Sequence, residues 1–495
     1  MKAEETGFFK KTRFLALSYK VRKSLQDFLT LTRSRKISNL SIYAKDDYNS
    51  MISISIKKGL GLNIEGKPSD ELEESGKPVH VAVLPEKIPF IKPRLLIEVN
   101  DDVSVGSPLF EDKRNPDIKF LSPGAGKIAD INFGPRRVIR EIVIKLSDVE
   151  TCTEYPAVSE DEIEHLERDK LVRLIMDGGL WPLIRELPFR DYARPDHTPP
   201  AIFVSLGAEE PFQPEPDVYL KNKKELFEYG IRVLKKLAEN VCISVSQDNS
   251  SVLKKLNGLV THTYKGVYPA DDPGVLLYHT KKSASENRSW YINGQDVLLL
   301  AYLLKTGSYP TERTVVIAGS SAKEKKHIAT RLGAPIGHIT QGRAEKDARY
   351  VVGGIFRGYI SSEQTCLGFY ETSVLLIPEG KEEEFLGFIR PGYNKPSYSS
   401  TFLSVFHEKP FRMNCNFHGE ERACVACGSC SKVCPVDILP QLTFKCILAD
   451  EVEESLEHGL LDCAECGLCS YVCPSKIDMM SVLKSAKAAY YKELS

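Results

Sequence analysis

The sequence predicts a multidomain protein of mixed α and β structure. The chain has 495 residues, and because typical domains hold about 150 residues, it has room for about three. Short Val-, Ile- and Leu-rich runs broken by Gly and Pro come first, and helical periodicity mixed with short strands follows. Eight of the 13 cysteines form two quartets near the C-terminus. The tail is therefore expected to be a separate chemical unit.

Composition excludes several classes of function. With 66 Lys and Arg against 67 Asp and Glu, the net charge of −1 gives no global positive field for nucleic acid phosphates. The longest apolar run, at 297–304, is far shorter than the roughly 20 residues that span a bilayer. No signal-peptide pattern opens the chain, and clustered thiols without one favour metal binding in a reducing compartment. We therefore expect a cytoplasmic protein.

Residues 1–50 differ in composition from the rest of the chain. They carry 11 Lys and Arg against 5 Asp and Glu, and apolar residues recur along them with helical spacing. This predicts a basic amphipathic extension that contacts an anionic membrane surface or a partner subunit. The alternative is that translation starts at Met51, directly before a well-patterned strand.

Residues 51–150 are predicted to form an all-β domain, because alternating apolar residues are separated there by Gly and Pro. Its segment 100–131 resembles the barrel-sandwich hybrid of biotinyl and lipoyl domains. We expect this lipoyl-like domain to be a scaffold.

Four further regions follow along the chain. Residues 160–311 mix helical periodicity with short apolar strands, which predicts an α/β domain. The pattern of strand, turn, helix and strands at 312–375 resembles a β-grasp module. Residues 376–412 are expected to link it to a helical, cysteine-rich domain at 413–495.

The cysteine pattern is the strongest functional signal in the sequence. The motif C-x2-C-x2-C-x3-C-P occurs twice with the same spacing. In two-cluster ferredoxins the first three cysteines of each motif bind one [4Fe-4S] cluster and the fourth binds the other. Cluster 1 is therefore predicted to use Cys424, Cys427, Cys430 and Cys473, and cluster 2 to use Cys463, Cys466, Cys469 and Cys434. This makes the tail a ferredoxin-like domain that transfers single electrons.

A pair of zinc sites is the alternative for these cysteines. Tetrahedral zinc also favours C-x2-C pairs, but it needs neither the third cysteine nor the trailing proline. Gly428 and Gly467 follow the second cysteine of each motif, where a residue without Cβ lets backbone N–H groups approach cluster sulfurs.

From Met51 to the C-terminus the chain resembles the NqrA family of the sodium-translocating NADH:quinone oxidoreductase, with kinship to the RnfC family of the Rnf complex. The segments that carry this resemblance are SIKKGLGLNIEGKP at 55–68, the lipoyl-like segment, DGGLWPLIRELPF at 177–189, GFIRPGYNKPSYSSTFLS at 387–404 and NFHGEERA at 416–423. The resemblance implies a peripheral protein on the cytoplasmic side of the inner membrane, docked on membrane-embedded and flavin-bearing subunits near the place where quinone is reduced.

The tail departs from the NqrA family. Members of that family have lost most of these cysteines, whereas this sequence keeps both quartets, as RnfC does. RnfC also carries a Gly-rich loop whose N–H groups hold flavin and nucleotide phosphates. At the matching place this chain has Leu180 and Trp181, which fill the space that a phosphate would need, and Pro182, which has no backbone N–H to donate. Binding of FMN by this chain is therefore not expected.

Trp181, Phe189 and Arg190 are candidates for a quinone-proximal site, because aromatic walls and cationic donors suit a flat ring with carbonyl ends. The alternative is that Trp181 and Phe189 only anchor the core of the α/β domain.

Together these patterns predict a subunit that relays single electrons through two clusters, from NADH to quinone, in a complex that exports sodium. It is not expected to be active alone. One alternative is an RnfC-like protein that receives electrons from NADH through a flavin. Another is a docking subunit whose clusters only keep the tail folded.

Overall fold

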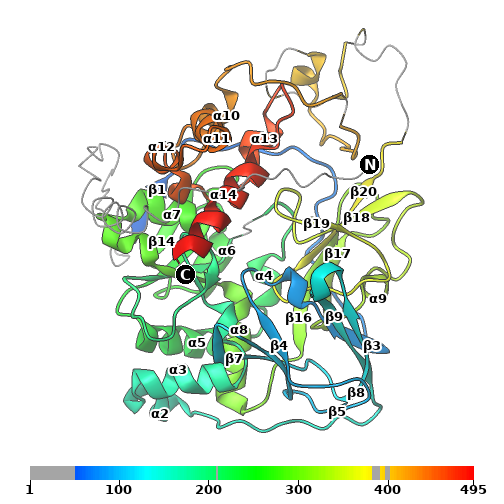
Figure 1. Ribbon diagram of the computed structural model, residues 1–495, viewed down its shortest axis with the longest axis vertical. Helices are drawn as coiled ribbons and strands as arrows, with labels where there is room; N and C mark the ends of the chain where they lie inside the picture. Colours follow the sequence, from blue (N-terminus) through cyan, green and yellow to red (C-terminus); the bar gives the residue numbers. More distant parts are fainter. Residues whose placement is uncertain are drawn as a thin grey trace.

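The computed structural model describes residues 51–494 apart from 208–209, 382–388, 390, 396–397, 399–401 and 418. The predicted extension at 1–50 lies outside the described residues. Figure 1 shows the C-terminal helices stacked on a helix-flanked sheet, with the remaining strands beside it.

A seven-stranded sheet forms the centre of the chain. Its order is β1-β14-β13-β12-β15-β10-β11; the first five strands run parallel, and β10 and β11 are antiparallel additions. The strands are β1 (Ile52–Ser55), β14 (His262–Lys265), β13 (Val241–Ser246), β12 (Ile202–Ser205), β15 (Trp290–Asn293), β10 (Arg185–Glu186) and β11 (Asp191–Tyr192). Parallel strands need helical crossovers, which explains the mixed helix and strand pattern in the sequence. The α/β prediction is confirmed.

Helices accompany this sheet in chain order. They are α2 (Glu160–His165), α3 (Arg168–Asp177), α4 (Pro216–Tyr219), α5 (Lys224–Leu237), α6 (Ser250–Lys255), α7 (Pro273–Thr280) and α8 (Gly294–Thr306). Helix α5 buries Phe227, Ile231 and Leu234 at the spacing of one helix face and packs against α8. The apolar run at 297–304 belongs to α8, a helix of 13 residues in this layer.

Two small antiparallel sheets contain the lipoyl-like segment. One has the order β3-β9-β8-β5 and the other β4-β6-β7. Their strands are β3 (His80–Val83), β9 (Ile139–Leu146), β8 (Gly126–Phe133), β5 (Asp102–Val103), β4 (Pro93–Leu95), β6 (Pro108–Asp112) and β7 (Asn115–Leu121). Their inward residues, such as Phe110 and Ile144, join one continuous core with the α/β domain.

A six-stranded mixed sheet follows, in the order β19-β18-β20-β16-β17-β2. Its strands are β19 (Tyr359–Ser361), β18 (Ala348–Val352), β20 (Ser373–Pro378), β16 (Glu312–Ala318), β17 (Lys326–Arg331) and β2 (Leu72–Glu74), and helix α9 (Ile336–Thr340) packs its apolar residues into the same core.

Strands β1 and β2, which the sequence placed in the β domain, pair outside the two small sheets. Strand β1 is the edge of the seven-stranded sheet, paired in parallel with β14, and β2 pairs with β17. Alternation identifies a strand but not its partner, because any sheet with an apolar face can bury residues such as Ile54 and Ile56. The two small sheets therefore begin at His80.

The C-terminal part is helical, with α10 (Ser429–Val433), α11 (Pro440–Leu448), α12 (Val452–Glu457), α13 (Leu468–Tyr471) and α14 (Met479–Leu494). Figure 1 shows α14 descending from this group toward the α/β domain. Its Tyr491 stacks on Phe189 with ring centroids 4.5 Å apart, and its hydroxyl donates to Asp191. None of the helices in the described ranges is long and apolar enough to cross a membrane.

Candidate functional site

The two cysteine motifs have the same backbone conformation. Ala426 and Glu465 occupy equivalent positions and have φ values of 55° and 56°, and Gly428 and Gly467 follow with 70° and 77°. The left-handed region favours glycine, which accounts for its presence after the second cysteine of each motif. At Gly467 a Cβ would also lie 2.8 Å from the Cβ of Phe356. Each motif then starts a short helix, α10 or α13.

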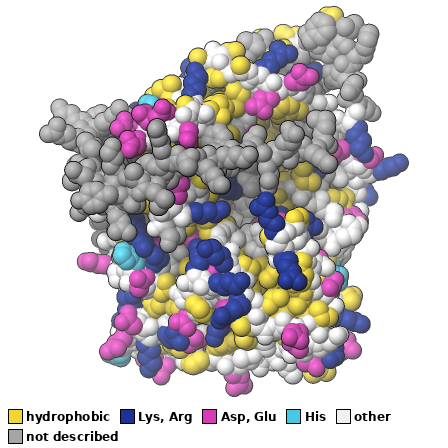
Figure 2. All heavy atoms as spheres, viewed as in Figure 1, with side chains coloured by type: hydrophobic (Ala, Val, Ile, Leu, Met, Phe, Trp, Pro, Cys, Tyr) yellow, Lys and Arg dark blue, Asp and Glu magenta, His cyan; other side chains and the backbone are white. Residues whose placement is uncertain are grey.

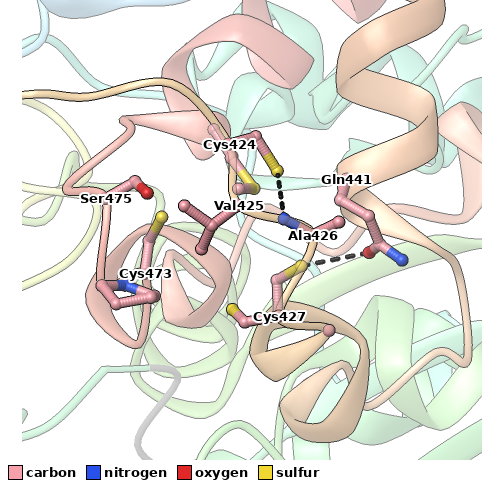
Figure 3. A pocket seen from close by; sticks show the side chains of 11 residues that line it. Cys424, Val425, Ala426, Cys427, Gln441, Cys473 and Ser475 are labelled. Atoms are coloured by element: carbon pink, nitrogen blue, oxygen red, sulfur yellow. Dashed lines mark hydrogen bonds between the residues drawn. The ribbon is translucent and has the colours of Figure 1, made fainter.

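The fourth cysteine of the second motif lies with the first motif. One small pocket is lined by Cys424, Cys427, Cys430 and Cys473, although Cys473 is more than 40 positions away from the others in the chain. Figure 3 shows Cys424, Cys427 and Cys473 around this pocket, with Gln441 beside them. The oxygen of Gln441 accepts from the Cys430 thiol at 3.1 Å. The structure therefore brings together the four predicted ligands of cluster 1.

The fourth cysteine of the first motif lies with the second motif. Burial, and then the charge of the nearby Cys463, raise the pKa of Cys434 to about 12. Burial is likewise the main cause of the raised pKa of Cys469, to which Cys463, Cys466, Cys434 and Cys430 all contribute. Cys434 also packs into the same apolar cluster as Cys463 and Cys469.

The donor sets fit iron–sulfur clusters, because each consists of four thiols from two segments in the crossed pattern of a two-cluster ferredoxin. Within the described ranges no three His, Cys, Asp or Glu side chains converge as they would around a single metal ion.

The two sites differ in exposure. Cys427 is exposed and Val425 keeps 68% of its surface in solvent, whereas Ala464, in the corresponding place of the second motif, is buried. The second loop lies against the α/β domain and the six-stranded sheet, and there Arg190 and Arg357 both donate to the Ala464 carbonyl.

A buried ion-pair network supports this contact. The carboxylate of Asp272 accepts from Arg190 at 2.8 Å and from Arg357 at 2.5 Å, and it is fully buried. Burial opposes ionisation of Asp272, but the two arginines outweigh it and lower its pKa. Asp272 also caps the N-terminus of α7 by accepting from the amides of Gly274 and Val275.

A cavity of about 340 Å³ adjoins the second cysteine loop. It lies where the parallel strands β12 and β15 end, since Ser205 and Asn293 line it, and this edge of a parallel sheet is where ligands usually bind. Its walls include aromatic rings and cations: Phe90, Phe189, Tyr359, Tyr370, Arg190, Arg357, Lys484 and Lys487. Figure 2 shows Lys and Arg side chains gathered near the centre of the face toward the viewer.

The three quinone candidates do not lie together. Phe189 and Arg190 line the cavity, but Trp181 does not. Its ring is fully buried, meets Trp290 edge-on at 5.6 Å, and its indole N–H donates to the Ala193 carbonyl at 2.7 Å. A large aromatic with a satisfied N–H is typical of a core anchor, so the quinone interpretation does not extend to Trp181.

Residues 178–182 are buried, and none of them lines the cavity beside the second cysteine loop. The amides of Gly178, Gly179 and Leu180 donate to carbonyls at the end of α3. A Cβ on Gly178 would lie 2.2 Å from the side chain of Leu303, and one on Gly179 would lie 2.4 Å from that of Leu121. Close packing therefore explains these glycines.

Sequence reasoning missed Asp272, Arg357 and Lys487. Only Asp272 had a local signal, because an Asp before a Pro is typical of a helix N-cap. Arg357 and Lys487 reach the site from β-sheet and helix segments far away in the chain, and no local pattern marks them.

Comparison with known proteins identifies two domains. The family described as the NqrA N-terminal barrel-sandwich hybrid domain matches residues 54–147, and the NqrA second alpha/beta domain matches residues 166–309. The barrel-sandwich prediction is thereby confirmed.

Related proteins match most of the chain. The NqrA subunit of the Na(+)-translocating NADH-quinone reductase of Histophilus somni (strain 129Pt) is 33% identical over 412 residues, which cover 83% of this chain and 92% of that protein. Its counterpart in Yersinia pestis bv. Antiqua (strain Angola) is 32% identical over 416 residues, with the same coverage. Among solved structures, a NAD+-reducing [NiFe]-hydrogenase in the H2-reduced state shares 13% identity over 66% of this chain and 64% of that chain, with a TM-score of 0.35.

Proposed function

Since the chain belongs to the NqrA family of the Na+-translocating NADH-quinone reductase, an oxidoreductase complex, we propose that it is an electron-transfer subunit whose tail holds two [4Fe-4S] clusters. The observation that carries this proposal is the position of Cys473, a second-motif residue, in the pocket of the first motif. When bound, such clusters supply reversible one-electron transfer.

The chain's own residues would hold each cluster from two segments. Cys424, Cys427, Cys430 and Cys473 form one set, and Cys463, Cys466, Cys469 and Cys434 form the other. Thiolates are the ligands of iron, so the buried thiols lose their protons on binding. We interpret the tail as ferredoxin-like and residues 312–375 as a β-grasp-like module that supports it.

Metal and sulfide analysis tests this proposal. Chain purified without oxygen should contain about eight iron and eight sulfide, because each set completes one cube of four irons. It should contain no stoichiometric flavin, because the amides of Gly178, Gly179 and Leu180 already donate to carbonyls at the end of α3. Stoichiometric zinc without sulfide would contradict the clusters, and bound flavin would favour the Rnf-like alternative.

The cavity beside the second motif is the proposed quinone-proximal site. Its position at the carboxyl ends of β12 and β15, the ring of Phe189 and the cation of Arg190 support this assignment. The protein would then relay electrons between a flavin-bearing partner and quinone at the cytoplasmic face of the membrane, while other subunits translocate sodium.

Replacing Phe189 with alanine should raise the KM for quinone in the assembled complex about three- to tenfold, since an aromatic contact contributes about 0.5–1.5 kcal/mol. Steady-state kinetics with unchanged iron content would measure this. Phe133→Ala removes an exposed ring on β8 and is the matched control. A changed kcat with an unchanged KM would argue against quinone contact at Phe189.

A structural role for the tail is the second candidate, favoured by the packing of the cysteine segments into one core with α7 and β1. Reduction of the clusters by NADH in the assembled complex distinguishes the two. Clusters that stay oxidised during turnover would make the tail a docking element.

A further inference from the structure

The second cysteine loop is held by four consecutive carbonyl groups. The carbonyl of Cys463 accepts from Lys487 at 2.8 Å, that of Ala464 from both arginines at 3.1 Å, and that of Glu465 from Arg357 at 3.1 Å. The carbonyl of Cys466 accepts from the Tyr268 hydroxyl at 2.8 Å. We call Arg190, Tyr268, Arg357 and Lys487 the loop clamp.

The loop clamp comes from three separate parts of the fold. Arg190 and Tyr268 belong to the α/β domain, Arg357 lies between β18 and β19, and Lys487 is on α14. The Lys487 side chain is 3% exposed, and Tyr268 is stacked on Phe356 with centroids 5.1 Å apart. The clamp is therefore positioned by packing and not by the loop itself.

The first loop is open to solvent instead. Val425 and Cys427 are exposed, whereas Ala464 of the second loop is buried. The local geometry is otherwise equal, since Ala426 donates its amide to the Cys424 sulfur at 3.4 Å and Glu465 does the same to Cys463. The two sites thus differ in what lies behind the loop.

Clamped carbonyls orient the peptide groups of the loop. In a trans peptide the N–H points away from the preceding C=O, so carbonyls drawn outward to Lys, Arg and Tyr turn the following N–H groups toward the sulfurs. Donors that face the sulfurs favour the more negative, reduced state of a cluster, and hydrogen bonds of this kind set cluster potentials. Three carboxylates, Asp272, Glu210 and Glu465, balance the three cations of the clamp, so oriented dipoles dominate its effect.

We propose that the loop clamp raises the reduction potential of the second-motif cluster, so that a single electron rests on this cluster, next to the cavity. The inference rests on the proposed function and assigns the clamp residues as positioning residues, since they touch the loop and not the cluster. The exposed first-motif site then faces redox partners, and the second-motif site faces the cavity that Arg190, Arg357 and Lys487 also line.

Potentiometric titration of the anaerobically purified full-length chain, followed by electron paramagnetic resonance, tests the proposal. Cys427→Ser identifies the signal of the first-motif cluster. Lys487→Met should lower the ratio of reduced to oxidised second-motif cluster about tenfold at a fixed potential, which is a shift of about 59 mV for one electron. Lys487→Arg keeps a cationic donor, so the second-motif cluster of this variant should have nearly the potential of the unmodified chain.

Tyr268→Phe removes one donor without changing charge and keeps the ring, so it should shift the same cluster in the same direction by a smaller amount. Lys492→Met removes an exposed lysine of α14 and should shift neither cluster. If both Lys487→Met and Tyr268→Phe keep two clusters with unchanged potentials, the proposed effect of the loop clamp is wrong, but the proposed function is not affected. Absence of both clusters from the unmodified chain would overturn the proposed function and the clamp with it.

Discussion

Replacing Cys434 with serine should remove the cluster of the second motif, although Cys434 belongs to the first. Cys434 is the predicted fourth ligand of that cluster and packs into one core with Cys463, so its loss should open one corner of the set. Iron and sulfide should fall from about eight to about four per chain, because each cluster carries four of each. Iron analysis together with electron paramagnetic resonance of the remaining cluster measures this.

Cys446 offers a matched control for this substitution. It lies on α11 in the same part of the chain and belongs to neither motif, so Cys446→Ser should leave the iron content unchanged. A Cys434→Ser chain that keeps the second-motif signal and loses that of the first would show that each motif binds its own cluster.

Replacing Asp272 with asparagine should destabilise the protein by about 3–5 kcal/mol, because it leaves the buried Arg190 and Arg357 without their carboxylate. Asparagine is also a good N-cap, so the start of α7 is retained and the loss reports the missing charge. The midpoint of urea unfolding measures the effect. Asp117→Asn, which breaks an exposed pair with Arg173, should cost less than about 1 kcal/mol.

The effect of Asp272 should depend on pH in a defined direction. Its pKa is lowered in the folded state by the two arginines, so its contribution is fully present above the unfolded pKa of about 3.9 and is lost as the pH falls through the folded value. The stability difference between the unmodified chain and Asp272→Asn should be constant above about pH 5 and shrink only in stronger acid. A difference that already varies between about pH 6 and 8 would point to another group.

The cysteine-rich tail shows which features a local sequence pattern can predict. The motif was found twice with the same spacing, and the structure gives both copies the same backbone conformation, with positive φ values at Ala426 and Glu465. The crossing of Cys434 and Cys473 was also predicted, because spacing reflects the reach of consecutive thiols around a cluster. The exposure of one site and the burial of the other could not be predicted, because they depend on what packs behind each loop.

The candidate cavity shows where local patterns fail. Phe189 and Arg190 were chosen from the chemistry of their side chains, and both line the cavity. Trp181, only eight residues earlier, was chosen for the same reason, but its side chain is buried in the core. A ring beside a turn can face either way, and its direction is decided by which side buries more apolar surface and offers a partner to the indole N–H. That partner, Ala193, directly follows strand β11.

By itself the sequence determined the α/β and barrel-sandwich domains, the two cysteine motifs and the family, because periodicity, cysteine spacing and motifs are properties of neighbouring residues. Only the tertiary structure decided the sheet that each of β1 and β2 joins, the burial of Trp181, and the meeting of Asp272, Arg357 and Lys487 around the second loop. These last three residues are up to about 200 positions apart in the chain. Their contacts form because packing the domains together buries apolar surface, and the charged groups that this brings inside must then find partners.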